Sequence, residues 1–172
     1  ICNLIKAKLL GAGCIIAVDK SPYRLQFARD FGAAHALDVA STTPAQRREL
    51  VLELTGGRGA DVVVECAGVP SAIVEGIEML RQGGTFVEEG HFVDVGNIQI
   101  NPHRHLCAKT IRLIGQMNPA YTGIIPSINL LVANKDRYDF DKLVTHSYHY
   151  TESLEGLLKS MSPDCMKVVI HA

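Results

Sequence analysis

The sequence lacks an apolar run of the roughly 18–20 residues that a membrane-spanning helix needs. It also lacks an excess of charge of either sign, because the formal net charge of the 172 residues is −1. Neither a nucleic acid nor an anionic membrane is therefore indicated as a partner. Residues 1–10 are apolar, but their lysines follow the first apolar positions and no small-residue cleavage site comes next, which argues against a signal peptide. With 47% hydrophobic and 20% charged residues, the composition is that of an ordinary soluble globular domain.

The cysteines lack any regular pattern. No C-x-x-C pair occurs among Cys2, Cys14, Cys66, Cys107 and Cys165. An odd and unpatterned set argues for reduced thiols in a cytoplasmic protein rather than for a disulfide framework. It also argues against a zinc site built from cysteines alone.

Short β-branched runs alternate with helical patterns, which predicts the α/β class with a doubly wound parallel sheet. Strands are expected at residues 14–18, 35–39, 60–65, 85–90 and 110–116, with extended segments at 143–150 and 167–170. Helices are expected at residues 4–10, 22–31, 44–54, from 70 to the glycine pair at 83–84, at 124–133 and from 151 onwards. In the helix at 124–133, the residues expected to face the core are Ile128, Leu131 and Val132. Residues 97–109 are expected to be irregular.

Asp19, which ends the run at 14–18, is the most specific single residue. An acid at the carboxyl end of the second strand of a dinucleotide-binding fold can accept hydrogen bonds from both adenosine ribose hydroxyls. Its charge also disfavours a 2′-phosphate, so it selects NAD over NADP. Lys20 and Arg24 belong to the same candidate contact set. The alternative is that Asp19 is only a polar strand end beside a helix N-cap.

The sequence Gly11-Ala12-Gly13 is not read as a phosphate-binding loop. The third glycine of a G-x-G-x-x-G motif would fall at Ile16, and the segment follows a helix and opens a strand, which is the reverse of the required order. A helix-to-strand turn is predicted instead.

Taken in order, several segments resemble the medium-chain dehydrogenase/reductase superfamily, most closely its zinc-dependent alcohol, sorbitol and butanediol dehydrogenase branch. The resemblance is carried by residues 7–13, 18–19, 24, 28, 31–33, 59–68, 80–87 and 167–170. It implies a Rossmann fold with strand order 3-2-1-4-5-6. It also implies an NAD-binding domain over residues 1–150, and a helix and strand at 151–172 that return to the catalytic domain in the family.

The same resemblance implies which parts lie outside this sequence. It places the third glycine of the phosphate-binding motif directly before Ile1, so the first strand, the phosphate loop and the catalytic domain would precede it. Zinc would be bound there, and we expect no catalytic residue and no metal ligand in this chain. Because strands two and four would each lack a neighbour, a polypeptide of this length is expected to fold marginally, to bind NAD poorly and to have no turnover.

The resemblance also implies where the cofactor would be contacted. One segment would border the ribose groups, one would approach the nicotinamide carboxamide, and one is the corresponding segment after strand six. These candidate contacts are Cys66, Ala67 and Gly68; Gly90, His91 and Phe92; and Gly115, Gln116 and Met117. The alternative is that all three are turns chosen for backbone conformation alone.

Three further features bear on metal binding and on assembly. His103, His105 and Cys107 have residue types that suit zinc, but Pro102 and Arg104 favour a loop and no fourth ligand is evident, so no metal site is expected. His146 and His149 are expected to be surface or hydrogen-bonded core residues.

By resemblance, residues 111–114 form the edge strand through which subunits pair into a homodimer or homotetramer. The alternative is an ordinary covered edge.

The whole enzyme is therefore expected to transfer hydride between a small-molecule alcohol or polyol and NAD, with zinc polarising the alkoxide. A zinc-free quinone or enoyl reductase of the same superfamily is an alternative, which Asp19 disfavours because such enzymes usually prefer NADP. A methyltransferase would also place an acid at this strand end, but its antiparallel closing strand is not evident. A non-catalytic nucleotide-binding module remains a third possibility.

Overall fold

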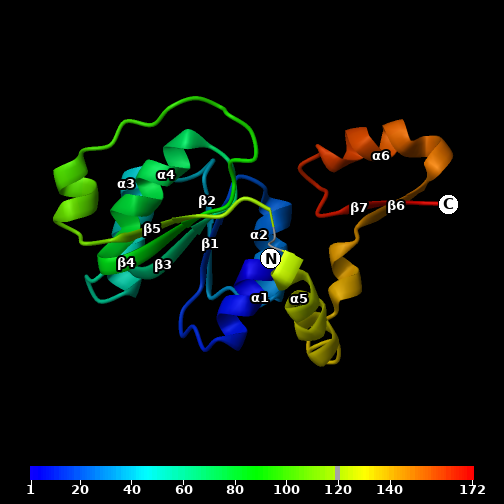
Figure 1. The fold of residues 1–172 in the computed structure, drawn as a ribbon, viewed down its shortest axis with the longest axis horizontal. Coiled ribbons are helices and arrows are strands. Elements are labelled where there is room, and N and C mark those ends of the chain that lie inside the picture. Colours follow the sequence, from blue (N-terminus) through cyan, green and yellow to red (C-terminus); the bar gives the residue numbers. More distant parts are fainter. Residues whose placement is uncertain (119–120) are drawn as a thin grey trace. The chain divides into compact units, whose positions relative to one another are not determined.

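The computed structural model describes residues 1–118 and 121–172. The chain forms two compact units, which Figure 1 traces by colour along the sequence. The first unit contains the described parts of residues 1–40 and 120–172, and the second contains those of residues 41–119. Each unit has its own parallel strands and its own hydrophobic core.

The first unit begins with a parallel strand pair joined by a helix. Its elements are α1 (Cys2–Leu9), β1 (Ile16–Asp19), α2 (Pro22–Asp30) and β2 (His35–Asp38). Strands β1 and β2 pair in parallel, and Asp19 lies opposite Asp38. Helix α2 starts where the sequence predicts, because the Ser21 side chain accepts a hydrogen bond from the backbone N–H of Arg24 and Pro22 occupies the first turn.

The rest of the first unit is a second parallel pair with its own crossover helix. Its elements are α5 (Tyr121–Ala133), a 3-10 turn (Phe140–Leu143), β6 (His146–His149), a second 3-10 turn (Tyr150–Glu152), α6 (Ser153–Ser160) and β7 (Val168–His171). Strands β6 and β7 pair in parallel. The core of the unit contains Ile5, Phe31 and Tyr138, and the last two rings stack at a centroid distance of 6.3 Å.

The second unit is a three-stranded parallel sheet covered by helices. Its elements are α3 (Pro44–Leu54), β3 (Ala60–Glu65), α4 (Pro70–Met79), β4 (Leu80–Glu88), a π-helical turn (Pro102–Cys107) and β5 (Arg112–Gly115). The strand order is β3-β4-β5, and Figure 1 shows the three strands side by side. Helix α4 packs on β3 and β4. The core of the unit contains Ile77, Leu80 and Phe86.

These sheets confirm the expected α/β class with parallel strands. In the strand numbering of the resemblance, β2 and β1 are strands three and two, and β3, β4 and β5 are strands four, five and six, so the order expected within each sheet is confirmed. Strands β1 and β3 carry exposed valines, with Val18 42% and Val62 57% exposed. None of the described helices has the length and apolarity needed to cross a membrane, and within the described residues no disulfide joins the cysteines.

The predicted end of helix α4 is wrong. The helix stops at Met79, and Leu80 is already extended and pairs with Ala60 in the sheet, so the glycines at 83–84 lie inside β4. The β3–β4 register shifts between Ala60 and Val62 and is regular from there onwards. A distant residue helps to end the helix: the Lys109 ammonium donates hydrogen bonds to the carbonyls of Ile77, Glu78 and Leu80 at 2.8, 2.8 and 2.7 Å.

The predicted inward face of helix α5 is also wrong. Ile128, Leu131 and Val132 are 49%, 42% and 61% exposed, and none of the residues of α5 is classed as buried. The apolar spacing correctly predicted a helix, but no described element covers that face.

Residues 102–107, expected to be irregular, form the π-helical turn, which begins where the Asn101 side chain accepts a hydrogen bond from the backbone N–H of Arg104.

Replacing Lys109 with Met is expected to lower the stability of the last turn of α4 by about 2 kcal/mol, because three carbonyls lose their donor and unsatisfied groups cost about 1–3 kcal/mol. Burial lowers the pKa of Lys109, but the three acceptors hold its ammonium in place. Amide hydrogen exchange of α4 in the full-length protein measures the effect. Lys135→Met, at an exposed position, is the matched control, and equal exchange in the two variants would contradict the capping role.

Candidate functional site

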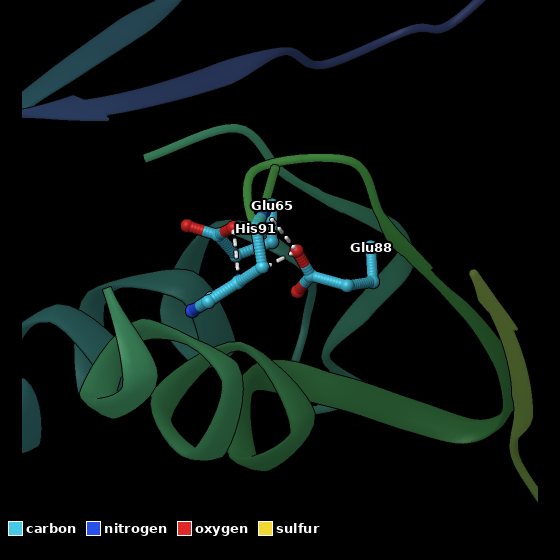
Figure 2. A group of neighbouring side chains, drawn as sticks. All are labelled: Glu65, Glu88 and His91. Carbon is cyan, nitrogen blue, oxygen red and sulfur yellow. Dashed lines mark hydrogen bonds and ion pairs between the residues drawn. The ribbon is translucent and has the colours of Figure 1, made fainter. Parts of the chain in front are cut away.

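Three side chains meet at the carboxyl ends of β3 and β4. Glu65 and Glu88 are the last residues of these strands and lie opposite each other in the register, and His91 follows in the next loop. The Nδ1 atom of His91 lies 2.8 Å from Oε1 of Glu88 and 3.6 Å from Oε2 of Glu65 (Figure 2). One donor atom from each residue falls within 4.8 Å of the others. We call these residues the Glu65–Glu88–His91 cluster.

Backbone N–H groups hold both carboxylates in place. Ala67 and Gly68 donate to Oε1 of Glu65 at 2.8 and 3.1 Å. The backbone N–H groups of residues 90 and 91 donate to Oε1 of Glu88 at 2.9 and 3.2 Å. The turns after the two strands therefore fix the orientation of the acids.

The pKa values of the two acids are shifted in opposite directions. Burial is the main cause that raises the pKa of Glu65, and its backbone hydrogen bonds only partly oppose it. Burial also acts to raise the pKa of Glu88, but hydrogen bonds from the side chain of His91 and from backbone N–H groups outweigh it, so that this pKa lies below its usual value. The Glu65 side chain is only 3% exposed, so its charged form is the costlier of the two.

An open hollow of about 580 Å³ lies beside the cluster within the second unit. Glu88 and His91 line it, together with Phe92 and other residues of the loop after β4 and with Met117 after β5. Two buried atoms in this region have no hydrogen-bond partner among the described residues: Oε2 of Glu88 and Nε2 of His91.

The structure brings two of the three predicted cofactor segments together in the second unit. Gly68 has a φ of +66°, and a Cβ atom there would lie 2.6 Å from the carbonyl oxygen of Gly90, so the turns that contain residues 66–68 and 90–92 touch. The third segment is tied to the same sheet edge, because the backbone N–H of Gln116 donates to the carbonyl of Glu88 at 2.8 Å. Their contact with a cofactor stays a prediction.

Asp19 lies where the sequence predicts, at the carboxyl end of β1 in the first unit. Its Oδ1 accepts a hydrogen bond from the backbone N–H of Ser21 at 2.9 Å, and its Oδ2 has no partner among the described residues. Arg24 is partly engaged, because its Nε donates to the carbonyl of Cys165 at 3.4 Å. Lys20 is exposed.

The histidines outside the cluster do not gather into a metal site in the described part of the chain. His105 is buried, and its Nδ1 accepts a hydrogen bond from the backbone N–H of Asn101 at 3.0 Å. His103 and Cys107 are exposed. In the first unit, His146 and His149 have hydroxyl partners within hydrogen-bond distance.

Sequence reasoning missed the two acids of the cluster. It used the carboxyl end of a parallel strand as the signal for Asp19, and the same rule applies to Glu65 and Glu88. That rule could have named each acid singly, but only the register between β3 and β4 shows that Glu65 and Glu88 meet.

Known proteins resemble this chain over nearly its whole length. Residues 1–131 match the model of a family described as zinc-binding dehydrogenase. This chain belongs to that family. A relative, 5-exo-hydroxycamphor dehydrogenase of Pseudomonas putida, is 34% identical over 98% of this chain and 46% of its own length. A sorbitol dehydrogenase of Halalkalibacterium halodurans is 32% identical over 93% of this chain and 45% of its own.

A solved structure agrees with these sequence relatives. The alcohol dehydrogenase of Thermotoga maritima superposes with a TM-score of 0.91 at 28% identity, covering 98% of this chain and 46% of that one. The chain therefore spans about half the length of each of these three proteins. Membership in this family confirms the expected resemblance, and it excludes the methyltransferase reading.

Proposed function

We propose that the protein carrying this chain is an NAD-dependent alcohol or polyol dehydrogenase, and that residues 1–150 belong to its NAD-binding domain. The zinc-dependent alcohol and polyol dehydrogenases of this family use NAD, and their zinc site lies in the other domain. The relatives named above also favour a dehydrogenase over a zinc-free reductase. Residues 151–172 are proposed to return to the catalytic domain.

The observation that carries the proposal is the carboxylate of Asp19. Its Oδ1 is fixed by Ser21, and its Oδ2 is left for a ligand at the end of a parallel strand. A ribose diol has two hydroxyl donors that match such a carboxylate, so these residues fit the adenosine half of NAD. A phosphate at the 2′ position would bring a like charge next to Asp19, which favours NAD over NADP.

In this reaction, bound NAD would supply the hydride acceptor, and zinc in the other domain would supply a Lewis acid for the alcohol oxygen. The residues of this chain bind and orient the cofactor. We propose that the backbone of the Gly68 and Gly90 turns borders the nicotinamide half, because these turns touch at the carboxyl edge of a parallel sheet, where such folds bind their ligands. The segment around Gly115 would complete that border.

Asp19→Ser in the full-length enzyme is expected to raise the KM for NAD about 10- to 100-fold, because hydrogen bonds to a charged group contribute about 1.5–3 kcal/mol. The preference for NAD over NADP should fall by at least as much. Steady-state kinetics with both cofactors measures the ratio. Asp38→Ser is the matched control, since Asp38 ends β2 and accepts a similar hydrogen bond from the backbone N–H of Ala40 at 2.8 Å. An unchanged cofactor ratio in the Asp19 variant would overturn the assignment.

We also propose that two copies pair through β5 to form a homodimer or a homotetramer. Strand β5 is an edge of its sheet in the order β3-β4-β5, and Leu113 and Ile114 are 54% and 47% exposed. Exposed apolar edge strands tend to pair with another chain. We propose a cytoplasmic location as well, because no disulfide joins the cysteines of the described residues.

A further inference from the structure

We propose that the Glu65–Glu88–His91 cluster binds one divalent transition-metal ion, Zn²⁺ or Mn²⁺, within the second unit. This site is separate from the zinc of the catalytic domain and does not depend on the proposed cofactor. Two carboxylates and one imidazole nitrogen converge within 4.8 Å, and the described residues hold no other such group (Figure 2). In a tetrahedral site with ligand distances of about 2.0–2.2 Å, neighbouring donor atoms lie roughly 3.3–3.6 Å apart. The distance of 3.6 Å from Nδ1 of His91 to Glu65 already matches, and the 2.8 Å to Glu88 would widen as the ion replaces that hydrogen bond.

The charge of the cluster calls for a cation. The side chains of Glu65 and Glu88 are 3% and 22% exposed, and within the described residues neither forms an ion pair with a lysine or arginine. His91 is their sole ion-pair partner there, and an imidazole supplies at most one positive charge. Burying two like charges side by side is costly unless a proton or a cation neutralises them. A divalent ion would neutralise both carboxylates at once.

One buried oxygen gives an independent indication of a missing partner. Oε2 of Glu88 is inaccessible to solvent and has no hydrogen-bond partner among the described residues. Such orphaned groups are rare in folded proteins, and a bound water or ion is a usual explanation. Oε2 of Glu88 offers the ion a second oxygen, and the adjoining hollow gives it room for water ligands.

The surroundings resemble those of a prepared metal site. Backbone N–H groups after β3 and β4 fix Oε1 of each carboxylate, and hydrogen bonds of this kind orient ligating carboxylates in known metal sites. Gly90 permits the close approach, because a Cβ atom there would collide with Oε2 of Glu65. An imidazole together with carboxylates suits Zn²⁺ or Mn²⁺ better than Ca²⁺ or Mg²⁺, which prefer oxygen ligands alone.

Metal content of the full-length protein tests the proposal. The protein is dialysed against Mn²⁺ with its zinc left in place, freed of loosely held metal by gel filtration, and analysed for zinc and manganese per chain. The sum for the wild type should exceed that of Glu88→Gln and of His91→Gln by one equivalent. Glutamine keeps the size of glutamate and removes a buried charge, so Glu88→Gln is expected to fold, which circular dichroism checks.

His103→Gln is the control, because it removes an exposed histidine of the same unit and should leave the sum at the wild-type value. Glu65→Gln gives a third test should one of the two main variants fail to fold. A loss of one equivalent in every folded cluster variant, and not in the control, supports the site. Equal sums in the wild type and in a folded cluster variant would overturn it and leave the cluster as a hydrogen-bonded group of protonated and charged acids.

Discussion

Replacing Arg47 with Met is expected to lower the stability of the second unit by about 3–5 kcal/mol, the usual cost of removing one partner of a buried ion pair. The guanidinium is 3% exposed and contacts both carboxylate oxygens of Glu75, at 2.6 and 2.7 Å. It also donates to the carbonyl and the hydroxyl of Thr42. The hydrogen bond to Glu75 is the main cause that raises the pKa of Arg47, so the guanidinium stays charged. Without Arg47, the 17% exposed Glu75 loses its ion-pair partner.

Amide hydrogen exchange of helices α3 and α4 in the full-length protein measures this loss. Arg48→Met is the control on the same helix, and because Arg48 is exposed its replacement should change stability by no more than about 0.5 kcal/mol. The double variant Arg47→Met with Glu75→Leu removes both charges and should recover most of the loss, since apolar replacements of buried pairs are often neutral. An Arg47→Met variant as stable as Arg48→Met would show that the pair contributes nothing.

Gly68→Ala is expected to destabilise the edge formed by β3 and β4 by about 2–5 kcal/mol. Two penalties add at this residue. A left-handed conformation costs an alanine about 1–2 kcal/mol, and forcing a side chain into a filled space costs about 1–3 kcal/mol. The φ of Gly68 is +66°, and its new Cβ would lie 2.6 Å from the carbonyl oxygen of Gly90.

Gly56→Ala separates the two penalties. Gly56 has nearly the same φ, +61°, but an added Cβ meets nothing within 4 Å, so this variant should lose only about 1–2 kcal/mol. Hydrogen exchange of the strands next to each glycine compares the two. Equal losses would mean that the turns after β3 and β4 are not pressed together, and the close approach would then play no part in shaping the site.

Local signals in the sequence were enough to place several elements. The bounds of α3 and β3 agree with the predicted ranges 44–54 and 60–65. Helix α3 has a complete capping box between Thr43 and Gln46 with Pro44 in its first turn, and these are short-range features that a sequence displays directly. The end of α4 could not be found in this way, because Leu80 continues the helical spacing and the stabilising ammonium comes from Lys109, far along the chain.

The candidate site residues also differ in whether local sequence or long-range pairing determines their positions. Asp19 could be predicted because its place follows from one strand and the helix after it. The cluster could not, because it depends on how two strands align across more than twenty residues of intervening chain. His91 was named in advance through a resemblance, but its two acidic neighbours follow only from the pairing of Glu65 with Glu88. Long-range alignment of this kind leaves no local trace in a sequence.

The irregular start of the β3–β4 pair has a consequence for how this site can evolve. Residue 60 pairs with 80 and residue 62 with 85, so β4 takes three more residues than β3 to cover the same stretch. These three extra residues decide which face of the sheet each later side chain of β4 points to, because neighbouring side chains of a strand point to opposite faces. Removing one residue within 81–84 would place Glu89 opposite Glu65, and adding one would place Val87 there. Whether Glu65 and Glu88 lie side by side therefore depends on the length of the segment at residues 81–84, and not only on the identity of the three side chains of the cluster.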